Sequence, residues 1–512
     1  MNHRTAGDWT DVAYPYSYTV EMNPVRLRLA FLKAGLTPPP CATACELGFG
    51  QGVSVNIHAA ATSGQWYGTD FNPAHAAVAG ELAAASGAGA RLFDESFADF
   101  CRRPDLPEFD YIALHGVWSW ISDRDRAGIV DFVRRKLRPG GVLYVSYNTL
   151  PGCASMLPVR EMLFEHVEQM NVAGQSLVSK IDAAIDFADK LLAADPAYLR
   201  AHPQAAERIK SLKESNRSYL AHEYFTRHWQ PTTFARTSRW LAGARMNFAC
   251  SASYFDHVPG LGLTSEQRKV LRDIPDPLFM QTVWDLMVNR QFRADYWTKG
   301  ARRLGQAQQL EELRKQRVVL TFPAADIPAI TLSTPLGTVQ VPDEVVRPVF
   351  DVLADHEPRT LEQIEQAVAG KDISFQKLVD TVMLLISTNL LSPAQEESAV
   401  EQARRHTDKL NAALCGDGGA QRDIDFLASP LIGGGFPVHR FSKLFLHAAG
   451  EGLSQPEELA SFVWKILDAQ GERLIKDGAA IDDEAGAVAE LARLAAHFTD
   501  KQLPLLRALR VA

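Results

Sequence analysis

The chain has 512 residues, of which 46% are hydrophobic and 22% are charged, a composition that excludes a disordered or fibrous protein. Its length exceeds what one hydrophobic core supports, so we expect roughly two to four domains. The formal net charge of -8 argues against a broad nucleic-acid-binding surface, and we expect no nucleic acid among its partners.

The sequence gives no signal for membrane insertion. It lacks a run of about 18 apolar residues that would span a bilayer, and its first residues, MNHRTAGDWTD, lack the apolar core of a signal peptide. The six cysteines are scattered, and the one close pair, Cys41 and Cys45, falls at a predicted strand. We therefore predict a cytoplasmic protein with reduced, structural thiols and no metal site.

Residues 42–148 alternate short β-rich runs with helical stretches. The expected strands are 42–47, 65–70, 90–95, 109–116 and 141–148, and the expected helices are 53–61, 73–85 and 124–137. This alternation predicts right-handed βαβ units and a parallel sheet covered on both faces, which is a Rossmann-like α/β fold. Such sheets bind ligands at the carboxyl ends of their strands. We expect this core to occupy residues 1–154.

The character of the sequence changes after Pro151. Residues 155–228 are rich in Ala and Leu, without a convincing strand, and predict a helical insertion. A helix at 230–244 and strands at 245–254 and 292–297 are expected after it. Residues 229–300 are therefore predicted to return to the sheet and complete it.

A polar, charged segment at 301–317 is the clearest domain boundary. The β-rich stretch beyond it precedes three predicted helices, at 343–355, 360–369 and 374–390. Together they suggest a small winged-helix-like module over 318–400. Residues 331–400 contain four basic and eleven acidic side chains, which would repel a phosphate backbone, so we expect a packing or protein-docking role. Residues 401–512 are expected to form a C-terminal helical region.

The strongest local signal is the glycine-rich segment CELGFGQG, residues 45–52, which joins the first predicted strand to the first helix. Gly48 and Gly50 permit a tight turn that a ligand can approach closely. A phosphate-binding P-loop would need Gly-Lys-Ser/Thr, which is missing, and a dinucleotide fingerprint would need glycine where Val53 stands. The remaining pattern, Glu46 followed by three alternate glycines, resembles motif I of the class I S-adenosylmethionine-dependent methyltransferases.

This resemblance implies a seven-stranded class I methyltransferase domain and the cofactor S-adenosyl-L-methionine. The implied cofactor-binding residues follow the first four strands and are Glu46, Gly48, Phe49, Gly50, Gly52, Asp70, Phe71, Asn72, Asp94, Glu95, Ser96, Phe97, His115 and Gly116. Asp70 would accept hydrogen bonds from the ribose hydroxyls, and Phe71 and Phe97 would pack on the adenine. The alternatives are a helix cap at Asp70 and a solvated turn at 94–97. The segment LRPGG, residues 137–141, is similar to the family's turn before the fifth strand.

Four further segments relate the chain to one group within this family, and they are residues 14–36, 109–122, 146–153 and 219–231. They are similar to bacterial methyltransferases that carry a methyltransferase regulatory domain, here expected in 229–300. Some members of that family are protein-lysine methyltransferases that act on outer-membrane proteins. The sequence departs from the family at Asn23-Pro24, where Thr-x-Pro is usual, and at Phe49, where many members have Cys. Neither change removes a group that the chemistry needs.

The same resemblance places the methyl acceptor beside the fourth and fifth strands. The candidate catalytic residues are His115, Trp118, Tyr147, Asn148, Tyr16 and Tyr18. His115 would orient the acceptor, accept a proton, or make a structural hydrogen bond, and Trp118 would form a wall of the pocket. Tyr147 and Asn148 are expected to face one crevice.

Tyr16 and Tyr18 would close over the pocket with their rings toward a cation, or act as buried anchors. His222 and Glu223 are adjacent on a predicted helix and do not form a zinc motif, so a structural role is expected for both.

We therefore expect an enzyme that transfers a methyl group by direct displacement to a deprotonated amine, with protein lysine side chains as acceptor. With a reference pKa of ~10.4, roughly one lysine in a few thousand is neutral at pH 7, so a desolvating aromatic pocket would help. A hydroxyl acceptor would need a general base, for which His115 is the obvious candidate. The alternatives are a small-molecule or glycan O- or N-methyltransferase and a non-catalytic binding protein that retains the scaffold.

Overall fold

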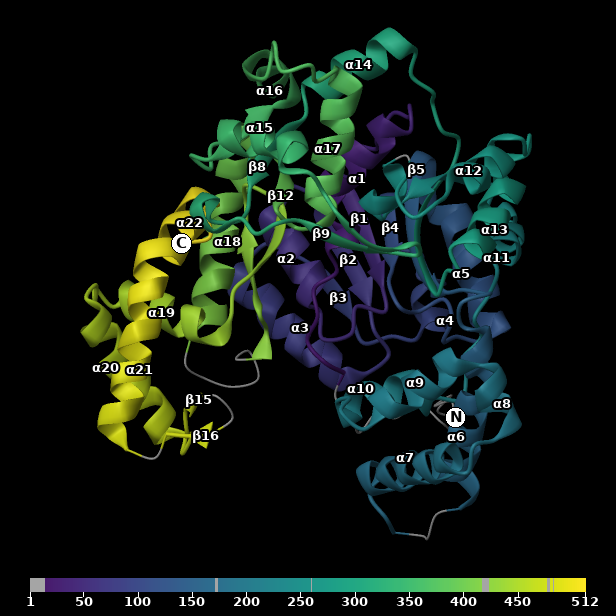
Figure 1. Ribbon diagram of the computed structural model, residues 1–512, viewed down its shortest axis with the longest axis horizontal. Coiled ribbons are helices and arrows are strands. Elements are labelled where there is room, and N and C mark those ends of the chain that lie inside the picture. Colours follow the sequence, from purple (N-terminus) through teal and green to yellow (C-terminus); the bar gives the residue numbers. More distant parts are fainter. Residues whose placement is uncertain (1–13, 171–173, 259, 417–422, 477–478, 482) are drawn as a thin grey trace.

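The computed structural model describes residues 14–170, 174–258, 260–416, 423–476, 479–481 and 483–512. Within these residues the largest sheet has seven strands, in the order β3-β2-β1-β4-β5-β7-β6. They are β1 (Thr43–Leu47), β2 (Gln65–Thr69), β3 (Arg91–Phe93), β4 (Phe109–Leu114), β5 (Leu137–Asn148), β6 (Asn247–Ser251) and β7 (Phe292–Thr298). The first five are parallel, whereas β7 is antiparallel to β5 and to β6. The centre of the molecule is therefore an α/β domain with a mixed sheet (Figure 1).

Helices cover both faces of this sheet because its central strands are apolar on both sides. All six residues of β4 are buried. Tyr111 and Ala113 pack on one side, with α1 (Pro24–Lys33), α2 (Val53–Ala61) and α3 (Pro73–Ser86). Ile112 and Leu114 pack on the other, with α4 (Phe97–Phe100), α5 (Asp123–Lys136) and α11 (Phe234–Ala242). A short 3-10 helix, Val20–Met22, precedes α1.

A helical insertion between β5 and α11 has a core of its own. Its helices are α6 (Leu157–Gln169), α7 (Leu177–Ala193), α8 (Ala197–Ala201), α9 (Pro203–Leu212) and α10 (Arg217–Tyr224), after a 3-10 turn at Ala154–Met156. Leu163, Ile185, Ile209 and Leu220 come from four of these helices and are buried in one cluster. The insertion projects from the sheet domain as a separate lobe (Figure 1).

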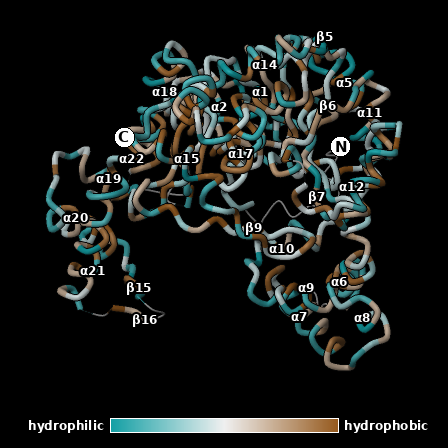
Figure 2. The backbone as a smooth tube through the Cα atoms, turned by 45° about the horizontal axis from the view of Figure 1, so that its top comes forward, coloured by the Kyte–Doolittle hydropathy of each residue, from teal (hydrophilic) through white to brown (hydrophobic). Residues whose placement is uncertain are grey.

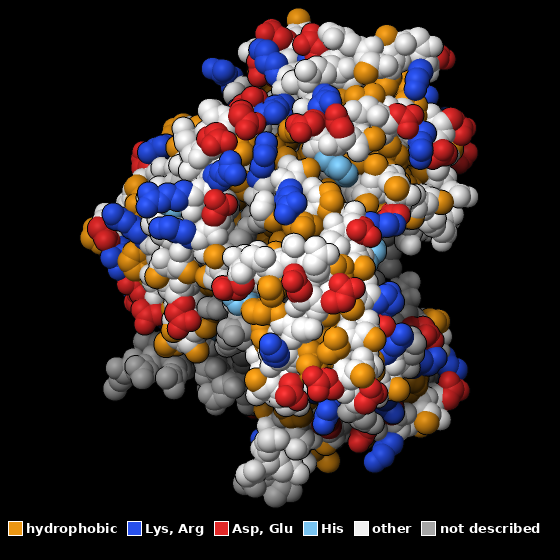
Figure 3. Space-filling view, turned by 90° about the vertical axis from the view of Figure 1, so that its left-hand side faces the viewer, with side chains coloured by type: hydrophobic (Ala, Val, Ile, Leu, Met, Phe, Trp, Pro, Cys, Tyr) orange, Lys and Arg blue, Asp and Glu red, His pale blue; other side chains and the backbone are white. Residues whose placement is uncertain are grey.

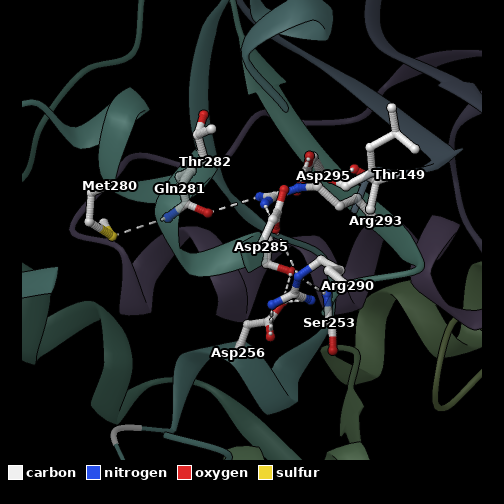
Figure 4. A network of polar contacts seen from close by, with 12 residues as sticks. Thr149, Ser253, Asp256, Met280, Gln281, Thr282, Asp285, Arg290, Arg293 and Asp295 are labelled. Atoms are coloured by element: carbon white, nitrogen blue, oxygen red, sulfur yellow. Dashed lines mark hydrogen bonds and ion pairs between the residues drawn. The ribbon is translucent and has the colours of Figure 1, made fainter. Parts of the chain in front are cut away.

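Buried ion pairs fix the chain that returns from this lobe. It forms β6, a 3-10 turn (Tyr254–His257), α12 (Ser265–Arg272), α13 (Pro277–Met287) and β7. Arg293 of β7 donates hydrogen bonds to Asp285 of α13 at 2.7 Å and to Asp295 of its own strand at 2.8 Å, and all three side chains are buried (Figure 4). Tyr147 of β5 donates to Asp295 at 2.8 Å. This network joins α13 to two strands of the sheet.

The segment after β7 forms two small sheets and four helices among the described residues. The strands are β8 (Arg317–Leu320), β9 (Thr331–Thr334), β10 (Gly337–Gln340), β11 (Arg359–Thr360) and β12 (Leu391–Ala394), with β11-β8-β12 and β9-β10 as sheets. The helices are α14 (Gln306–Arg314), α15 (Asp343–Leu353), α16 (Leu361–Ala367) and α17 (Phe375–Ser387), with a 3-10 turn at Ala324–Asp326. Hydrophobic stretches gather around α15 and α17, whose buried apolar residues share one core cluster (Figure 2).

The last part of the chain is mostly helical and packs on the helix that follows the glycine-rich turn. Its elements are α18 (Glu397–Cys415), β13 (Phe426–Ser429), β14 (Gly434–Pro437), α19 (Arg440–Gly450), α20 (Pro456–Ala469), β15 (Ile475–Lys476), β16 (Ala479–Ala480), α21 (Glu484–His497), a π-helical turn (Phe498–Gln502) and α22 (Leu503–Ala508). Val53 and Ile57 of α2 share one core cluster with Leu427 and Phe445. The C-terminal region and the sheet domain therefore share a core.

One local feature differs from the sequence expectation. β5 begins at Leu137, which pairs with Phe109, so the segment expected as a turn before the strand is already part of it. In the C-terminal region, Gly434 and Gly435 lie in β14 and belong to a hairpin with β13. On the side of the C-terminal helices, basic and acidic side chains are interspersed (Figure 3).

Across the described ranges, no helix combines the length and apolar character that crossing a membrane requires.

Replacing Arg293 with alanine is expected to lower the free energy of unfolding by about 3–5 kcal/mol, because Asp285 and Asp295 would remain buried without their shared cation. Urea unfolding of the purified protein measures this change. The exposed Arg272, replaced by alanine, serves as the control and should stay within about 0.5 kcal/mol of the parent. Equal unfolding midpoints for both variants would contradict the structural role of the network.

Candidate functional site

The glycine-rich turn after β1 lies against the end of β2. Gly48, Gly50 and Gly52 have φ angles of 76°, 56° and 75°, in the left-handed region that favours glycine. The Gly48 N–H donates to the carbonyl of Thr69 at 2.8 Å. A side chain at Gly48 would place its Cβ 2.7 Å from Val117, which follows β4. The turn therefore fills the space between β2 and the loop after β4 with bare backbone.

Asp70 closes this turn from the side of β2. Its carboxylate accepts hydrogen bonds from the N–H of Gly50 at 2.9 Å and from the N–H of Asn72 at 3.0 Å, and His75 lies 3.3 Å away. Asn72 caps α3 by accepting from the N–H of Ala74, so the capping role falls to Asn72. Phe71, between them, is 50% exposed, although its side chain is large and apolar. Asp70 thus presents a carboxylate at the turn, and Phe71 an uncovered ring next to it.

Glu46 is a buried carboxyl group on the last part of β1. It is 3% exposed, and its Oε2 atom has no hydrogen-bond partner within the described chain. Burial, with a smaller contribution from Asp70, raises its pKa to about 8. A buried polar atom without a partner is unusual in a folded protein and indicates a ligand at this position.

The residues after β3 have separate roles. Asp94 is exposed, and Glu95 accepts a hydrogen bond from Arg103 at 2.6 Å. Ser96 caps α4 and donates to Asp99 at 2.7 Å. The Phe97 ring lies 3.4 Å from the position that a Cβ of Gly48 would take, so it forms part of the wall beside the turn. Phe49 is buried over Gly68 of β2.

His115 and Gly116 follow β4 beside an open space. His115 Nδ1 lies 2.8 Å from the Tyr144 hydroxyl and 3.1 Å from Ser146 Oγ. Burial lowers the pKa of His115, so its imidazole is neutral at pH 7. Gly116 has a φ of 65°, and a Cβ there would meet no atom within 4 Å. The ring of Phe292 contacts His115 edge-on, with 5.9 Å between centroids.

The structure places several residues that were predicted to line the acceptor site in separate environments. Tyr147 and Trp118 are each 1% exposed and belong to the hydrophobic cluster on the opposite face of the sheet from Tyr144. Neighbouring residues of a strand point to opposite faces, so Tyr147 does not share a crevice with Asn148. Trp118 packs edge-on against Trp240 in that cluster and is not a wall of the pocket. Asn148 Oδ1 accepts from the indole of Trp229 at 3.3 Å.

Tyr16 and Tyr18 lie against the C-terminal region. Tyr18 shares a 3.0 Å hydrogen bond with His58 of α2, and its ring lies against the backbone of Gly434 and Gly435. Tyr16 is partly buried against the same core cluster. Tyr18 therefore anchors the N-terminal segment to α2 and the C-terminal region, away from the glycine-rich turn that it was expected to cover.

Tyr14, from the same N-terminal segment, lies at the turn. Its carbonyl accepts a hydrogen bond from Gln51 at 3.1 Å, and its ring lies 3.8 Å from the position of a Cβ on Gly50. The same ring contacts His222 of α10 edge-on, with 5.1 Å between centroids. Beside His222, burial raises the pKa of Glu223 to about 7. Sequence reasoning did not single out Tyr14, and it expected a structural role for His222 and Glu223, because no local pattern shows which side chains of distant segments meet.

Two segments of the chain match models of known protein families. Residues 44–141 match the family model described as "Methyltransferase domain", and residues 216–299 match "Predicted methyltransferase regulatory domain". The uncharacterized protein sll1526 of Synechocystis is 34% identical, over 98% of this chain and 98% of its own. The uncharacterized protein RP028 of Rickettsia prowazekii is 30% identical, over 42% of this chain and 86% of its own.

The fold is shared with a solved structure over almost the whole length. PKMT2 from Rickettsia typhi, solved in complex with AdoHcy, covers 97% of this chain and 100% of its own, with a TM-score of 0.71 and 19% sequence identity. The likeness therefore extends from the sheet domain through the helical insertion and the C-terminal region.

The residues at the turn fit S-adenosyl-L-methionine. The ribose of this cofactor offers two hydroxyl donors, which Asp70 would accept, and its amino group offers a cation, which suits the unpartnered oxygen of Glu46. The bare backbone of the turn admits the methionine part, and Phe71 and Phe97 offer apolar faces for the adenine.

Replacing Asp70 with asparagine is expected to weaken binding of S-adenosylhomocysteine roughly 10- to 100-fold, because hydrogen bonds to a charged acceptor contribute about 1.5–3 kcal/mol. Isothermal titration calorimetry measures this loss. The control is Asp186→Asn in the helical insertion, where the side chain is exposed. An unchanged dissociation constant for Asp70→Asn would place the ribose elsewhere.

Replacing Glu46 with glutamine is expected to stabilise the free protein above neutral pH. The pKa is about 8 in the folded state against 4.5 for the ordinary group, so the folded state binds more protons between these values. The free energy of unfolding should therefore fall as pH rises from about 4.5 to about 8, by on the order of 5 kcal/mol, and Glu46→Gln should remove this fall. Urea unfolding across that range tests it, with the exposed Glu81→Gln as control. If the free energy of unfolding still falls with pH in Glu46→Gln, a group other than Glu46 takes up the proton on folding.

Proposed function

This chain belongs to the S-adenosylmethionine-dependent methyltransferases that carry a methyltransferase regulatory domain, and we propose that its acceptor is the side-chain amine of protein lysines. The observation that carries the proposal is the extent of the likeness to PKMT2, which continues far beyond the part that holds the cofactor. The segments at 14–36, 109–122, 146–153 and 219–231 also resemble bacterial methyltransferases with a regulatory domain, some of which are protein-lysine methyltransferases. A small-molecule enzyme would not require so large an architecture outside the sheet domain.

The acceptor side of the site favours an amine over a hydroxyl. A hydroxyl must lose its proton during transfer and needs a general base, whereas a neutral amine attacks with its own lone pair. The lowered pKa of His115 makes its imidazole a weaker base, and its Nδ1 already lies within hydrogen-bond distance of Tyr144 and Ser146. His115 therefore suits orientation of the acceptor better than removal of a hydroxyl proton.

S-adenosyl-L-methionine supplies an electrophilic methyl group on a sulfonium centre. Asp70 and Glu46 would hold the two polar ends of the cofactor, and the open space at Gly116 would let the acceptor approach in line with the methyl group. A neutral His115 adds no positive charge that would oppose the sulfonium. The residues of the chain thus contribute position and a matched electrostatic environment.

The C-terminal region is proposed to take part in substrate docking. Residues 331–400 are acidic and suit a lysine-bearing partner. The winged-helix-like interpretation of 318–400 stays a prediction. The cytoplasmic location also stays a prediction. Because α2 shares its core with this region, a truncation would disturb the cofactor site, and point variants are the appropriate tests.

Incubation of the purified protein with methyl-labelled S-adenosylmethionine and a cell extract, separated into protein and low-mass fractions, tests the proposal. We expect base-stable label on protein, recovered as methyl-lysine, and a roughly 10-fold or greater loss with Asp70→Asn but not with Asp186→Asn. Label confined to the low-mass fraction would reject the lysine acceptor and favour a metabolite or glycan. No label in either fraction would reject a catalytic role under these conditions.

A further inference from the structure

A small polar cavity lies where three parts of the chain meet. Its walls come from the N-terminal segment, from the 3-10 turn after β6, and from β9 together with the end of α17. The cavity has a volume of about 210 Å³, and most of the residues that line it carry a hydroxyl group. Two charged residues, Glu21 and Arg26, complete the lining. The cavity therefore suits a small polar or charged group.

Arg26 brings a buried cation to this cavity. The residue lies on α1 and is 5% exposed. Its guanidinium carbon lies 4.6 Å from the centre of the Tyr254 ring, and the Tyr254 hydroxyl donates to the Arg26 carbonyl. The Nε atom has no hydrogen-bond partner within the described chain, and no described carboxylate forms an ion pair with the guanidinium. Because buried charges in folded proteins are normally paired, this one indicates an anionic ligand.

The groups around Arg26 suit a carboxylate. A guanidinium presents parallel N–H donors that match the two oxygens of a carboxylate. The hydroxyl groups of Ser253, Thr331 and Ser333 line the same cavity and donate to no residue that the structure describes, so they are available as further donors. The two hydroxyl groups at the end of α17, by contrast, already donate to carbonyls of that helix.

Glu21 adds a negative charge to the same cavity. Within the described residues it does not pair with Arg26, so the two opposite charges do not neutralise each other. A simple anion would be attracted by Arg26 and repelled by Glu21, whereas a ligand that carries both a carboxylate and a cation would compensate both charges. A peptide with an acidic side chain near a lysine carries both.

The cavity lies close to the acceptor side of the candidate site. The Tyr296 hydroxyl donates to the carbonyl of Glu21 at 2.6 Å. The Tyr296 ring packs on Tyr144 with 5.8 Å between centroids, and the Tyr144 hydroxyl lies 2.8 Å from His115 Nδ1. Two aromatic rings therefore connect the cavity to His115. An extended peptide advances about 3.3 Å per residue, so a chain whose lysine reaches His115 can place a side chain a few residues away in the cavity.

We propose that this cavity binds an acidic side chain of the protein acceptor, a few residues from the lysine that is methylated, and that Arg26 holds its carboxylate. This inference rests on the proposed function and specifies which lysines the enzyme selects. Ser253, Thr331 and Ser333 donate to the carboxylate oxygens, and Glu21 disfavours a free anion. Because β9 supplies part of the wall, the region after β7 contributes directly to the choice of acceptor.

The first test uses the parent protein alone. Lysines labelled in the cell extract are mapped by mass spectrometry, and an acidic residue should recur at one fixed offset from them, because one fold holds both the cavity and His115. A short peptide around such a lysine is then compared with a twin in which that Asp or Glu is replaced by its amide. We expect KM to be about 10-fold higher for the amide twin and kcat to be nearly unchanged, because the lost charge pair contributes equally to ground state and transition state.

The second test changes the cavity. Arg26→Gln should abolish the difference in KM between the two peptides, whereas a merely structural effect would alter both equally. Ser333→Asp leaves the core intact, since Ser333 is exposed, and its like charge should raise KM about fivefold for the acidic peptide but not for the amide twin. The exposed Ser179→Asp adds the same charge on the helical insertion and should behave as the parent.

Three outcomes would contradict the inference in different ways. Equal KM values for the two peptides in the parent protein, or no recurring acidic position, would overturn it while lysine methylation stays intact. If KM values are equal and succinate binds to the protein loaded with S-adenosylhomocysteine but not to its Arg26→Gln variant, the cavity takes a free carboxylate and the role in acceptor choice is overturned. Absence of methyl-lysine in the parent reaction would overturn the proposed function itself.

Discussion

The hydrogen bond from the Gly50 N–H to the Asp70 carboxylate is the contact on which the candidate site depends. It connects the turn after β1 to the end of β2 and sets the position of both. Only glycine tolerates the three left-handed backbone angles of this turn without strain, and a Cβ at Gly48 or Gly52 would collide with Val117 or Ala79. The bare backbone and the carboxylate are thus consequences of one local geometry.

The position of α2 extends this constraint to the far end of the chain. The helix begins directly after the turn, and all nine of its residues are buried. One side packs on the sheet and another on α18 and the β13-β14 hairpin. Tyr18 bonds to His58 on α2, and Asn23 donates to the carbonyl of Ile432 at 3.0 Å. The C-terminal region is therefore part of the support of the cofactor turn, and a change in its packing would reach the turn through α2.

Sequence patterns predicted the sheet domain well because its signals are local. The alternation of β-rich and helical runs over 42–148 placed the five parallel strands, and the glycine spacing identified the turn. The strands β6 and β7 were also expected to return to the sheet, and they form its edge. The roles of Tyr147 and Tyr18 were harder to predict. Tyr147 points to the opposite face of the sheet, because side chains alternate along β5. Tyr18 contacts residues more than 400 positions away in the sequence, and no local pattern reveals such a contact.

Glu46 and Glu223 share a physical property that links stability to function. Each is a carboxyl group that burial makes harder to ionise, with its pKa raised to about 8 and about 7. Such groups weaken the folded state of the free protein, since a buried charge without a partner is costly. Glu46 lies on β1 directly before the turn, and Glu223 lies on α10 next to His222, whose ring contacts Tyr14. A cation bound beside Glu46 would favour its ionised form and recover the lost free energy.

The cation that the cofactor carries matches the carboxyl group of Glu46. The amino group of S-adenosyl-L-methionine would pair with its unpartnered oxygen and favour the ionised form at neutral pH. Binding of the cofactor would therefore offset part of the free energy that this buried carboxyl group costs the free protein. The helical insertion reaches the same turn through the contact between Tyr14 and His222, so the turn is supported from the insertion as well as from the C-terminal region.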